Sequence, residues 1–292
     1  MTQENHEAAT AVIVEGDRAA SNLAVLHQRL TPCFARTRPH TQAGKYIAAL
    51  ISDLPRKNGW TIAEHVGDTT PDPTQRLLNH AVWDHEQAMG VVRGFVAEHL
   101  ADQPLVVAAL DESGQEKTGA ATAGVQRQYM GCAGRIANGV NTVYCSYATL
   151  GGHALVAARI YVPADQLADP ARRAACGISD EVVFRTKPQL ALDLCRDMVA
   201  DGSMPPWAAG DEVYGRSGQL RAFLQDNEIG YVMRVGCAFT SRSPLVPAFV
   251  PTTWWPDSSD RMPGRSARWP GPRANVATPG PGSRPPAPAT MC

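Results

Sequence analysis

Two aspartates, Asp111 and Asp211, are candidates for a chemical role because of their residue type and their positions in the sequence. Each directly follows a short apolar run, residues 105–110 and 207–210, that is typical of a buried strand. Sheets of the α/β class bind ligands at the carboxyl ends of their strands, so the two carboxylates converge if the strands are neighbours. Paired carboxylates suit Mg²⁺, which prefers oxygen ligands, and two such ions about 4 Å apart support an in-line displacement at a phosphodiester. The alternative is that both aspartates only cap turns.

The residues beside these aspartates, and the other reactive side chains, point to no other chemistry. Glu112 and Glu212 face away from their aspartate neighbours on an extended backbone, so we expect a structural or supporting role for them. A phosphate-binding Gly-x-x-x-x-Gly-Lys-Ser/Thr loop is absent, and so is the His-Glu-x-x-His zinc signature. Ser113 lacks the Gly-x-Ser-x-Gly context of a hydrolase nucleophile.

A basic cluster lies in the glycine-rich stretch that follows Asp111. Arg127, Tyr129 and Arg135 could line a phosphate backbone, because cationic side chains supply most of the affinity for nucleic acid. A solvated surface explains the same residues equally well. Both interpretations stay open at this point.

The segment 104–237 is expected to fold as a mixed α/β sheet that positions the two aspartates. Strands are predicted at residues 105–110, 139–147 and 153–162, with Gly151 and Gly152 turning between the last two. A helix at 187–200, a strand at 207–210, a helix at 219–227 and a strand at 231–235 follow. This order of elements predicts one sheet with helices packed against it.

The segment 17–103 is expected to be helical, after a polar and flexible N-terminus at residues 1–16. Thr61 and Glu64 have the spacing of a capping box, which predicts a helix start there. Two short helices around the turn at 68–73 have the outline of a helix-turn-helix, and the second carries Arg76, Asn79 and His80. We therefore expect a DNA-binding region here, with plain bundle packing as the alternative.

The segment 238–292 has a different composition from the rest of the chain. It holds about half of the 23 prolines, with Gly, Ser and Arg between them, and shows no apolar periodicity. Such a composition predicts disorder. Because this proline-rich stretch joins no second folded part, we interpret it as a frameshifted tail.

The overall composition is that of a folded protein. The chain has 292 residues, of which 44% are hydrophobic, which is enough for a sizeable core. The net charge of -1 neither supports nor excludes DNA as a partner, because a neutral total can hide a basic face. The seven scattered cysteines contain no Cys-x-x-Cys pair and indicate reduced thiols in the cytoplasm. No apolar run approaches the roughly 20 residues of a membrane helix, so no membrane contact is expected.

Several short motifs, in order, resemble those of insertion-sequence DDE transposases, in the branch named after insertion sequence seven-oh-one. The resemblance covers residues 27–235, and its motifs are those at 55–60, 63–65, 75–78, 83–84, 111–114, 124–129, 133–135, 186–188 and 210–215. It implies an RNase H-like catalytic core that binds Mg²⁺ (or Mn²⁺) and cuts and rejoins double-stranded DNA at transposon ends and target sites. Asp111 and Asp211 would be the first two metal ligands. A nucleoid-associated bacterial protein, monomeric or homo-oligomeric, is the corresponding expectation.

The sequence departs from this family where the third catalytic acid is expected. The family places a glutamate well beyond residues 231–235, whereas Asp257 and Asp260 lie in the proline-rich tail. We therefore expect an incomplete catalytic core and an inactive copy. One alternative is a catalytically inactive DNA-binding fragment that occupies transposon ends, and another is the product of a pseudogene.

Overall fold

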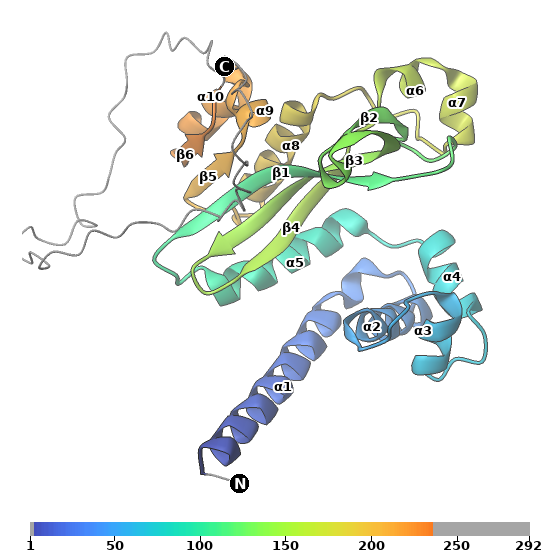
Figure 1. Cartoon of the computed structure of the whole chain (residues 1–292), viewed down its shortest axis with the longest axis vertical. Coiled ribbons are helices and arrows are strands. Elements are labelled where there is room, and N and C mark those ends of the chain that lie inside the picture. The colour runs from blue at the N-terminus through green and yellow to red at the C-terminus, as the bar shows by residue number, and fades with distance from the viewer. Residues whose placement is uncertain (1–2, 236–292) are drawn as a thin grey trace, which may run out of the picture. The chain divides into compact units, whose positions relative to one another are not determined.

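The computed structural model describes residues 3–235, and the side chains of helix α1 from Val14 onward. The described residues belong to one compact unit and are drawn in colour in Figure 1. The segment 238–292, for which the sequence predicts disorder, lies outside the described residues.

A six-stranded mixed sheet forms the centre of the unit, in the order β2-β3-β1-β5-β6 with β4 paired to β3. Its strands are β1 (Val106–Glu116), β2 (Gln126–Met130), β3 (Arg135–Thr149), β4 (His153–Ile160), β5 (Trp207–Gly210) and β6 (Gly230–Met233). β1 runs antiparallel to β3 and parallel to β5, and β5 runs parallel to β6. The predicted RNase H-like mixed α/β sheet is confirmed by this arrangement.

The helices fall into an N-terminal group and a group that follows or separates the strands. The first group is α1 (Gln3–Arg29), the short η1 (Thr31–Cys33), α2 (Thr37–Ile51), α3 (Gly59–His65), α4 (Asp72–Asn79) and α5 (His85–Leu100). The second is η2 (Gly131–Ala133), α6 (Ala164–Ala168), α7 (Pro170–Ala175), α8 (Lys187–Ala200), α9 (Glu212–Gly215) and α10 (Gly218–Asp226). The predicted helical N-terminal region is confirmed.

Some local predictions differ from the structure, each for a physical reason. Helix α1 begins at Gln3 rather than near residue 17, because the alanines and glutamates of this stretch favour a helix even though it is polar. Helix α3 is capped by Asn58, whose side chain accepts hydrogen bonds from the N–H groups of Trp60 and Thr61. Thr61 is therefore the third helical residue of this capping box and not its cap. Strand β2 and helices α6, α7 and α9 are too short for periodicity to reveal.

One face of the sheet carries the hydrophobic core. Val106, Ala108 and Leu110 of β1 are buried, while the alternate residues Val107 and Ala109 are only half-buried, as expected when one face is covered. Helices α8 and α10 pack on the buried face, together with Val96, Ala97 and Leu100 of α5. Helix α5, which the sequence places in the helical region, is thus part of the core under the sheet (Figure 1).

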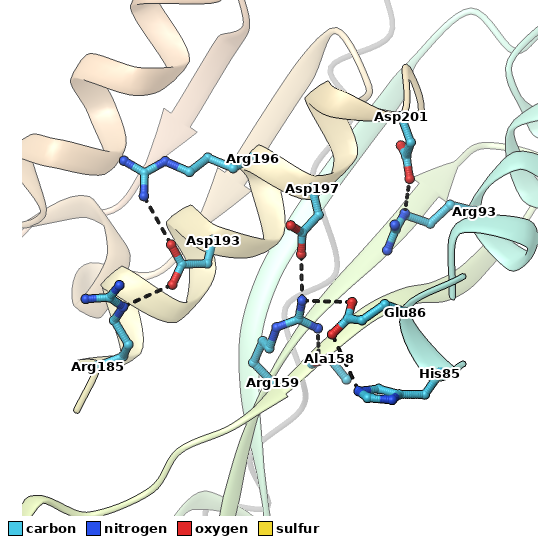
Figure 2. Close-up of polar contacts among 10 residues, drawn as sticks. All are labelled: His85, Glu86, Arg93, Ala158, Arg159, Arg185, Asp193, Arg196, Asp197 and Asp201. Carbon is cyan, nitrogen blue, oxygen red and sulfur yellow. Dashed lines mark hydrogen bonds and ion pairs between the residues drawn. The ribbon is translucent and has the colours of Figure 1, made fainter. Parts of the chain in front are cut away.

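Ion pairs join α5, β4 and α8 at the edge of this core (Figure 2). The Arg159 guanidinium of β4 lies 3.1 Å from the Glu86 carboxylate of α5 and 2.7 Å from the Asp197 carboxylate of α8. Arg93 of α5, whose side chain is only 7% exposed, contacts Asp201 at 2.6 Å just after α8. Because a buried guanidinium without its carboxylate is strongly destabilising, these pairs fix α5 against α8.

Helix α1 and the short η1 meet α5 through a smaller apolar cluster. Leu30, Cys33 and Ala88 are buried there, with Phe34 packed against them. The Phe34 ring also stacks on Trp83 at a centroid distance of 5.6 Å. This cluster attaches α1 and the segment after it to the beginning of α5.

Gly215, at the end of α9, lies in close contact with the backbone at the end of β6. A Cβ atom at this position would lie 1.9 Å from the carbonyl oxygen of Arg234. The Arg234 N–H in turn donates to the Gly210 carbonyl at 3.0 Å. Only a glycine allows α9 to pack this closely beside β5 and β6.

We predict that Gly215→Ala lowers the free energy of unfolding by about 1–3 kcal/mol, because the added methyl group must displace backbone atoms. Denaturant unfolding of the full chain measures this change. The matched control is Gly94→Ala within α5, where a Cβ atom would meet nothing within 4 Å. That variant should gain about 0.5–1 kcal/mol from its better helix propensity. Equal effects of the two substitutions would contradict the close-contact explanation.

Candidate functional site

The parallel pairing of β1 with β5 brings Asp111 and Asp211 to neighbouring positions. Leu110 lies opposite Gly210 in the register, and each aspartate is the next residue along its chain. Neighbouring strands are about 4.8 Å apart, so the two side chains start from adjacent backbone positions. That Asp111 and Asp211 act as metal ligands stays a prediction.

Both carboxylates are exposed and each accepts one local hydrogen bond. Asp111 Oδ1 accepts from the N–H of Glu112 at 2.8 Å. Asp211 Oδ1 accepts from the N–H of Val213 at 2.8 Å and so caps α9. The capping role considered for Asp211 is therefore present, and it occupies one carboxylate oxygen while the other belongs to no hydrogen bond in the described structure.

Asp111 lies within its strand and not at its end, contrary to the sequence prediction. β1 continues to Glu116 because its antiparallel ladder with β3 continues, from Asp111 opposite Tyr144 to Glu116 opposite Gly139. The parallel partner β5 ends at Gly210. Beyond Leu110, β1 is therefore paired to β3 but no longer to β5.

Glu112 connects three elements of the site. Its Oε1 lies 2.6 Å from Nζ of Lys187, the first residue of α8. Its Oε2 accepts a hydrogen bond of 2.8 Å from the hydroxyl of Tyr214 in α9. These two contacts are consistent with the supporting role expected for Glu112. They connect β1 to the beginning of α8 and to α9, next to both aspartates.

Tyr214 is fully buried, and its hydroxyl remains a proton donor. Burial raises the pKa of the Tyr214 phenol far above its ordinary value, and the negative charge of Glu112 raises it further, as do those of Asp111 and Asp211. The phenol thus stays neutral, so the Glu112 carboxylate keeps its hydrogen bond. Glu212 takes no part in this network and instead pairs with Arg216.

A polar cavity of about 440 Å³ adjoins Asp111. Its lining includes Asp111, Gly114, Gln128, Tyr129, Asn141 and Lys187. Asn141 is only 3% exposed, and its amide donates to Gln128 Oε1 at 2.9 Å. Asp211 does not line this cavity. The two aspartates therefore follow neighbouring positions of the sheet, but only Asp111 borders the cavity.

The residues expected to bind nucleic acid lie on two separate surfaces. Arg76 and Asn79 are exposed on α4, and His80 follows as its exposed C-cap. Arg127 is exposed on β2. Arg135 is exposed at the start of β3, where its guanidinium pairs with Glu116 at 3.0 Å. The structure brings Arg127 and Arg135 to one hairpin, while contact with DNA stays a prediction for all five.

A buried polar cluster holds the helix pair α3–α4 against α2. Asp68, in the turn between α3 and α4, pairs with Lys45 of α2. It also accepts a hydrogen bond of 2.8 Å from the buried amide of Gln42. The Lys45 hydrogen bond is the main reason why the pKa of Asp68 lies below its ordinary value, and Gln42 adds to this.

Among the described residues, no three His, Cys, Asp or Glu side chains are grouped so that they could hold a metal ion. The two carboxylates at Asp111 and Asp211 nevertheless fit Mg²⁺, which usually takes one or two carboxylates and completes its shell with water and phosphate oxygens. No helix in the part of the chain that the structure describes has the length and apolarity needed to cross a membrane.

Comparison with known proteins identifies the class of the chain. Residues 29–287 match the family described as DDE superfamily endonuclease, so the chain belongs to that family. It is also similar to the "Probable transposase for insertion sequence element IS701" of Microchaete diplosiphon, at 27% identity over 196 residues. That match covers 66% of this chain and 48% of the relative, so the chain spans about half of the relative's length.

Lys187, Tyr214 and Asn141 belong to the site, although no sequence pattern singled them out as site residues. Tyr214 follows Asp211 by three residues, and an aspartate cap before a helical turn would have suggested a shared helix face. Lys187 follows the Thr186 cap of α8, but its contact with Glu112 spans 75 positions of the chain. No local pattern could have shown that pairing.

We predict that Tyr214→Phe lowers the free energy of unfolding by about 1.5–3 kcal/mol, because the half-buried Glu112 carboxylate loses a hydrogen-bond donor. The matched control is Tyr231→Phe, since the Tyr231 hydroxyl only accepts an exposed hydrogen bond from Gln225. Denaturant unfolding of both variants measures the difference. If the two substitutions lower the free energy of unfolding equally, the hydrogen bond from Tyr214 to Glu112 does not contribute to stability.

We predict that Asp68→Asn lowers stability at neutral pH and that the loss disappears in acid. A carboxylate whose pKa is lowered on folding adds stability above its unfolded pKa of about 4, and loses it as the pH falls through the folded value. Thermal unfolding of the variant and the wild type at neutral and acidic pH measures this. Exposed Asp53, changed to Asn, is the control. A loss that is independent of pH would show that the Lys45 ion pair is not its source.

Proposed function

We propose that the chain is a DDE-type transposase that cuts DNA at the ends of a mobile element and joins the cut ends to target DNA. Membership of the DDE superfamily of endonucleases supports this proposal. The similarity to a probable insertion-sequence transposase supports it further. The observation that carries it is the register of β1 and β5, with Leu110 opposite Gly210 and an aspartate after each.

In this proposal Asp111 and Asp211 hold the divalent cation, Mg²⁺ or Mn²⁺. When bound, the metal lowers the pKa of an attacking oxygen and neutralises charge on the phosphate. The chain's own residues keep the two carboxylates ready: Val213 holds one oxygen of Asp211, and Glu112 anchors the strand beneath Asp111. Lys187 balances the charge of Glu112, so a third negative group beside the aspartates is already paired.

Double-stranded DNA is the proposed partner, both at the element ends and at the target. Arg76, Asn79 and His80 on the exposed side of α4 would contact the element end, as the second helix of a helix-turn-helix does. Arg127 on the β2–β3 hairpin would neutralise a DNA phosphate, and Arg135 would do so on exchanging its Glu116 partner for one. In this proposal the helical region recognises the element end, and the β2–β3 hairpin positions the DNA backbone.

A second candidate function is favoured by one specific observation. Within the described residues, no third acidic, histidine or cysteine side chain completes a metal-binding group with the two aspartates. A DDE protein with two of its three acids binds element ends and competes with an active copy without cutting. We keep this catalytically inactive DNA-binding function as the alternative.

We predict that the purified full chain nicks duplex DNA taken from the flanks of its own gene, when Mg²⁺ or Mn²⁺ is supplied. Asp111→Asn and Asp211→Asn should each lower nicking by several orders of magnitude, because grouped catalytic residues act as a unit. Gel electrophoresis of labelled duplex measures nicking, and mobility shift in EDTA measures binding. The matched control is Asp226→Asn, an exposed aspartate at the end of α10.

The outcomes separate the two functions. Nicking that depends on both aspartates but not on Asp226 supports the transposase. A salt-sensitive mobility shift without nicking supports the inactive DNA-binding protein. Isothermal titration with Mn²⁺ adds a readout that needs no cleavage: unchanged Mn²⁺ binding in Asp111→Asn would refute the metal-ligand role.

A further inference from the structure

We propose that the outer face of the β2–β3 hairpin, together with the cavity beside Asp111, is a subsite for an unpaired DNA nucleotide whose base stacks on Tyr129. The proposal rests on the proposed function only for the identity of the strand, which is the one that passes Asp111. Tyr129 would then be a binding residue that fixes the strand next to the reacting phosphate.

The hairpin presents an aromatic platform on its outer face. Tyr129 is 64% exposed, and Ile136, its partner in the ladder, is 59% exposed. Directly opposite residues of a ladder share one face, so the ring and the Ile136 side chain lie beside each other. Arg127, two positions before Tyr129, points to the same side of β2 and is also exposed.

The inner side of the same hairpin is built to be rigid. Gln128 donates to the Gly139 carbonyl at 3.0 Å and accepts from Asn141 at 2.9 Å. Met130 is fully buried, and a Cβ atom at Gly139 would lie 2.6 Å from its terminal methyl group. A platform on a rigid hairpin loses little conformational freedom when a ligand binds, so its contacts contribute more fully to affinity.

The cavity next to the platform has the size and polarity for part of a nucleotide. Its volume of about 440 Å³ is within the usual range of small-ligand sites. Tyr129 and Asp111 both line it, and so do the amide-bearing Gln128 and Asn141. A base stacked on Tyr129 would therefore lie at the margin of the cavity that Asp111 also lines.

Charge favours single-stranded DNA over a second protein chain as the ligand. Arg127 forms no ion pair within residues 3–235 and is available to a phosphate, whereas Arg135 is paired with Glu116. An exposed aromatic ring beside a free guanidinium is the combination that sheet-based binders use for unpaired bases. A base within a duplex is already stacked on its neighbours, so this platform selects an unpaired one.

The test measures binding of a short fluorescein-labelled single-stranded DNA of mixed sequence to the full chain in EDTA, where no cleavage can occur. Tyr129→Ala should weaken binding by about tenfold, since the base loses the aromatic ring on which it stacks. Tyr129→Phe keeps the ring and should bind within about twofold of the wild type. Leu150→Ala, which shortens another exposed apolar side chain, at the β3–β4 turn, is the control.

A second measurement locates the base directly. Single-stranded DNA that carries one 5-iododeoxyuridine should photocrosslink to Tyr129, which mass spectrometry of the digested complex identifies. Binding that Tyr129→Ala leaves unchanged, or a crosslink confined to α4, would overturn the proposal. So would sedimentation that shows loss of self-association in Tyr129→Ala with unchanged DNA affinity, because the face would then join two copies of the chain.

The result also separates this inference from the proposed function. Tyr129-dependent binding without any nicking leaves the subsite in place and refutes only the active transposase. Nicking that depends on Asp111 and is unaffected by Tyr129→Ala refutes the subsite and leaves the transposase.

Discussion

The parallel pairing of β1 with β5 is the constraint on which the site depends. It sets Leu110 beside Gly210, so the next residue on each chain, an aspartate, begins from an adjacent position. Ala108 and Ala208, which lie opposite each other in this ladder, are buried in the core that α8 and α10 share with the sheet. Gly215 then lets α9 turn back against the end of β6 without displacing either strand. A bulkier residue at Ala108 or Ala208 would meet the core residues of α8 and α10, and one at Gly215 would meet the backbone of Arg234.

Packing three acidic side chains near one another creates an electrostatic cost that the structure offsets locally. Glu112 is the acid that faces the helices, and it receives both a positive charge from Lys187 and a hydrogen bond from the Tyr214 hydroxyl. A half-buried carboxylate without such partners would take up a proton or destabilise the fold. Asp111 and Asp211 are instead exposed, and solvent stabilises their charges. The same three-residue network therefore satisfies Glu112 and leaves the two exposed acids available.

Helix α5 links the N-terminal helices to this sheet. Its apolar residues Val96, Ala97 and Leu100 belong to the core under the sheet, and its first turn lies near the small cluster around Cys33. Arg93 and Glu86 add ion pairs to α8 and β4 (Figure 2). Because these contacts are numerous and partly buried, α5 belongs to the rigid core. The helix pair α3–α4 is held separately, through Asp68 and the residues of α2 around it.

Local sequence patterns were enough to predict the order of most elements and the class of the fold. They also singled out Asp111 and Asp211, whose role as metal ligands stays a prediction. Helix α8 and strand β5 were predicted with the bounds that the structure has, because a Thr186 cap and a short apolar run are local signals. Local signals could not reveal β2, whose residues become a strand only by pairing with β3, nor the continuation of β1 past Asp111 along the same partner. The contacts of Glu112 with Lys187 and Tyr214, and the cavity between Tyr129 and Asp111, join residues far apart in the chain. Tertiary structure alone decided them, since strand register and helix packing set which distant side chains meet.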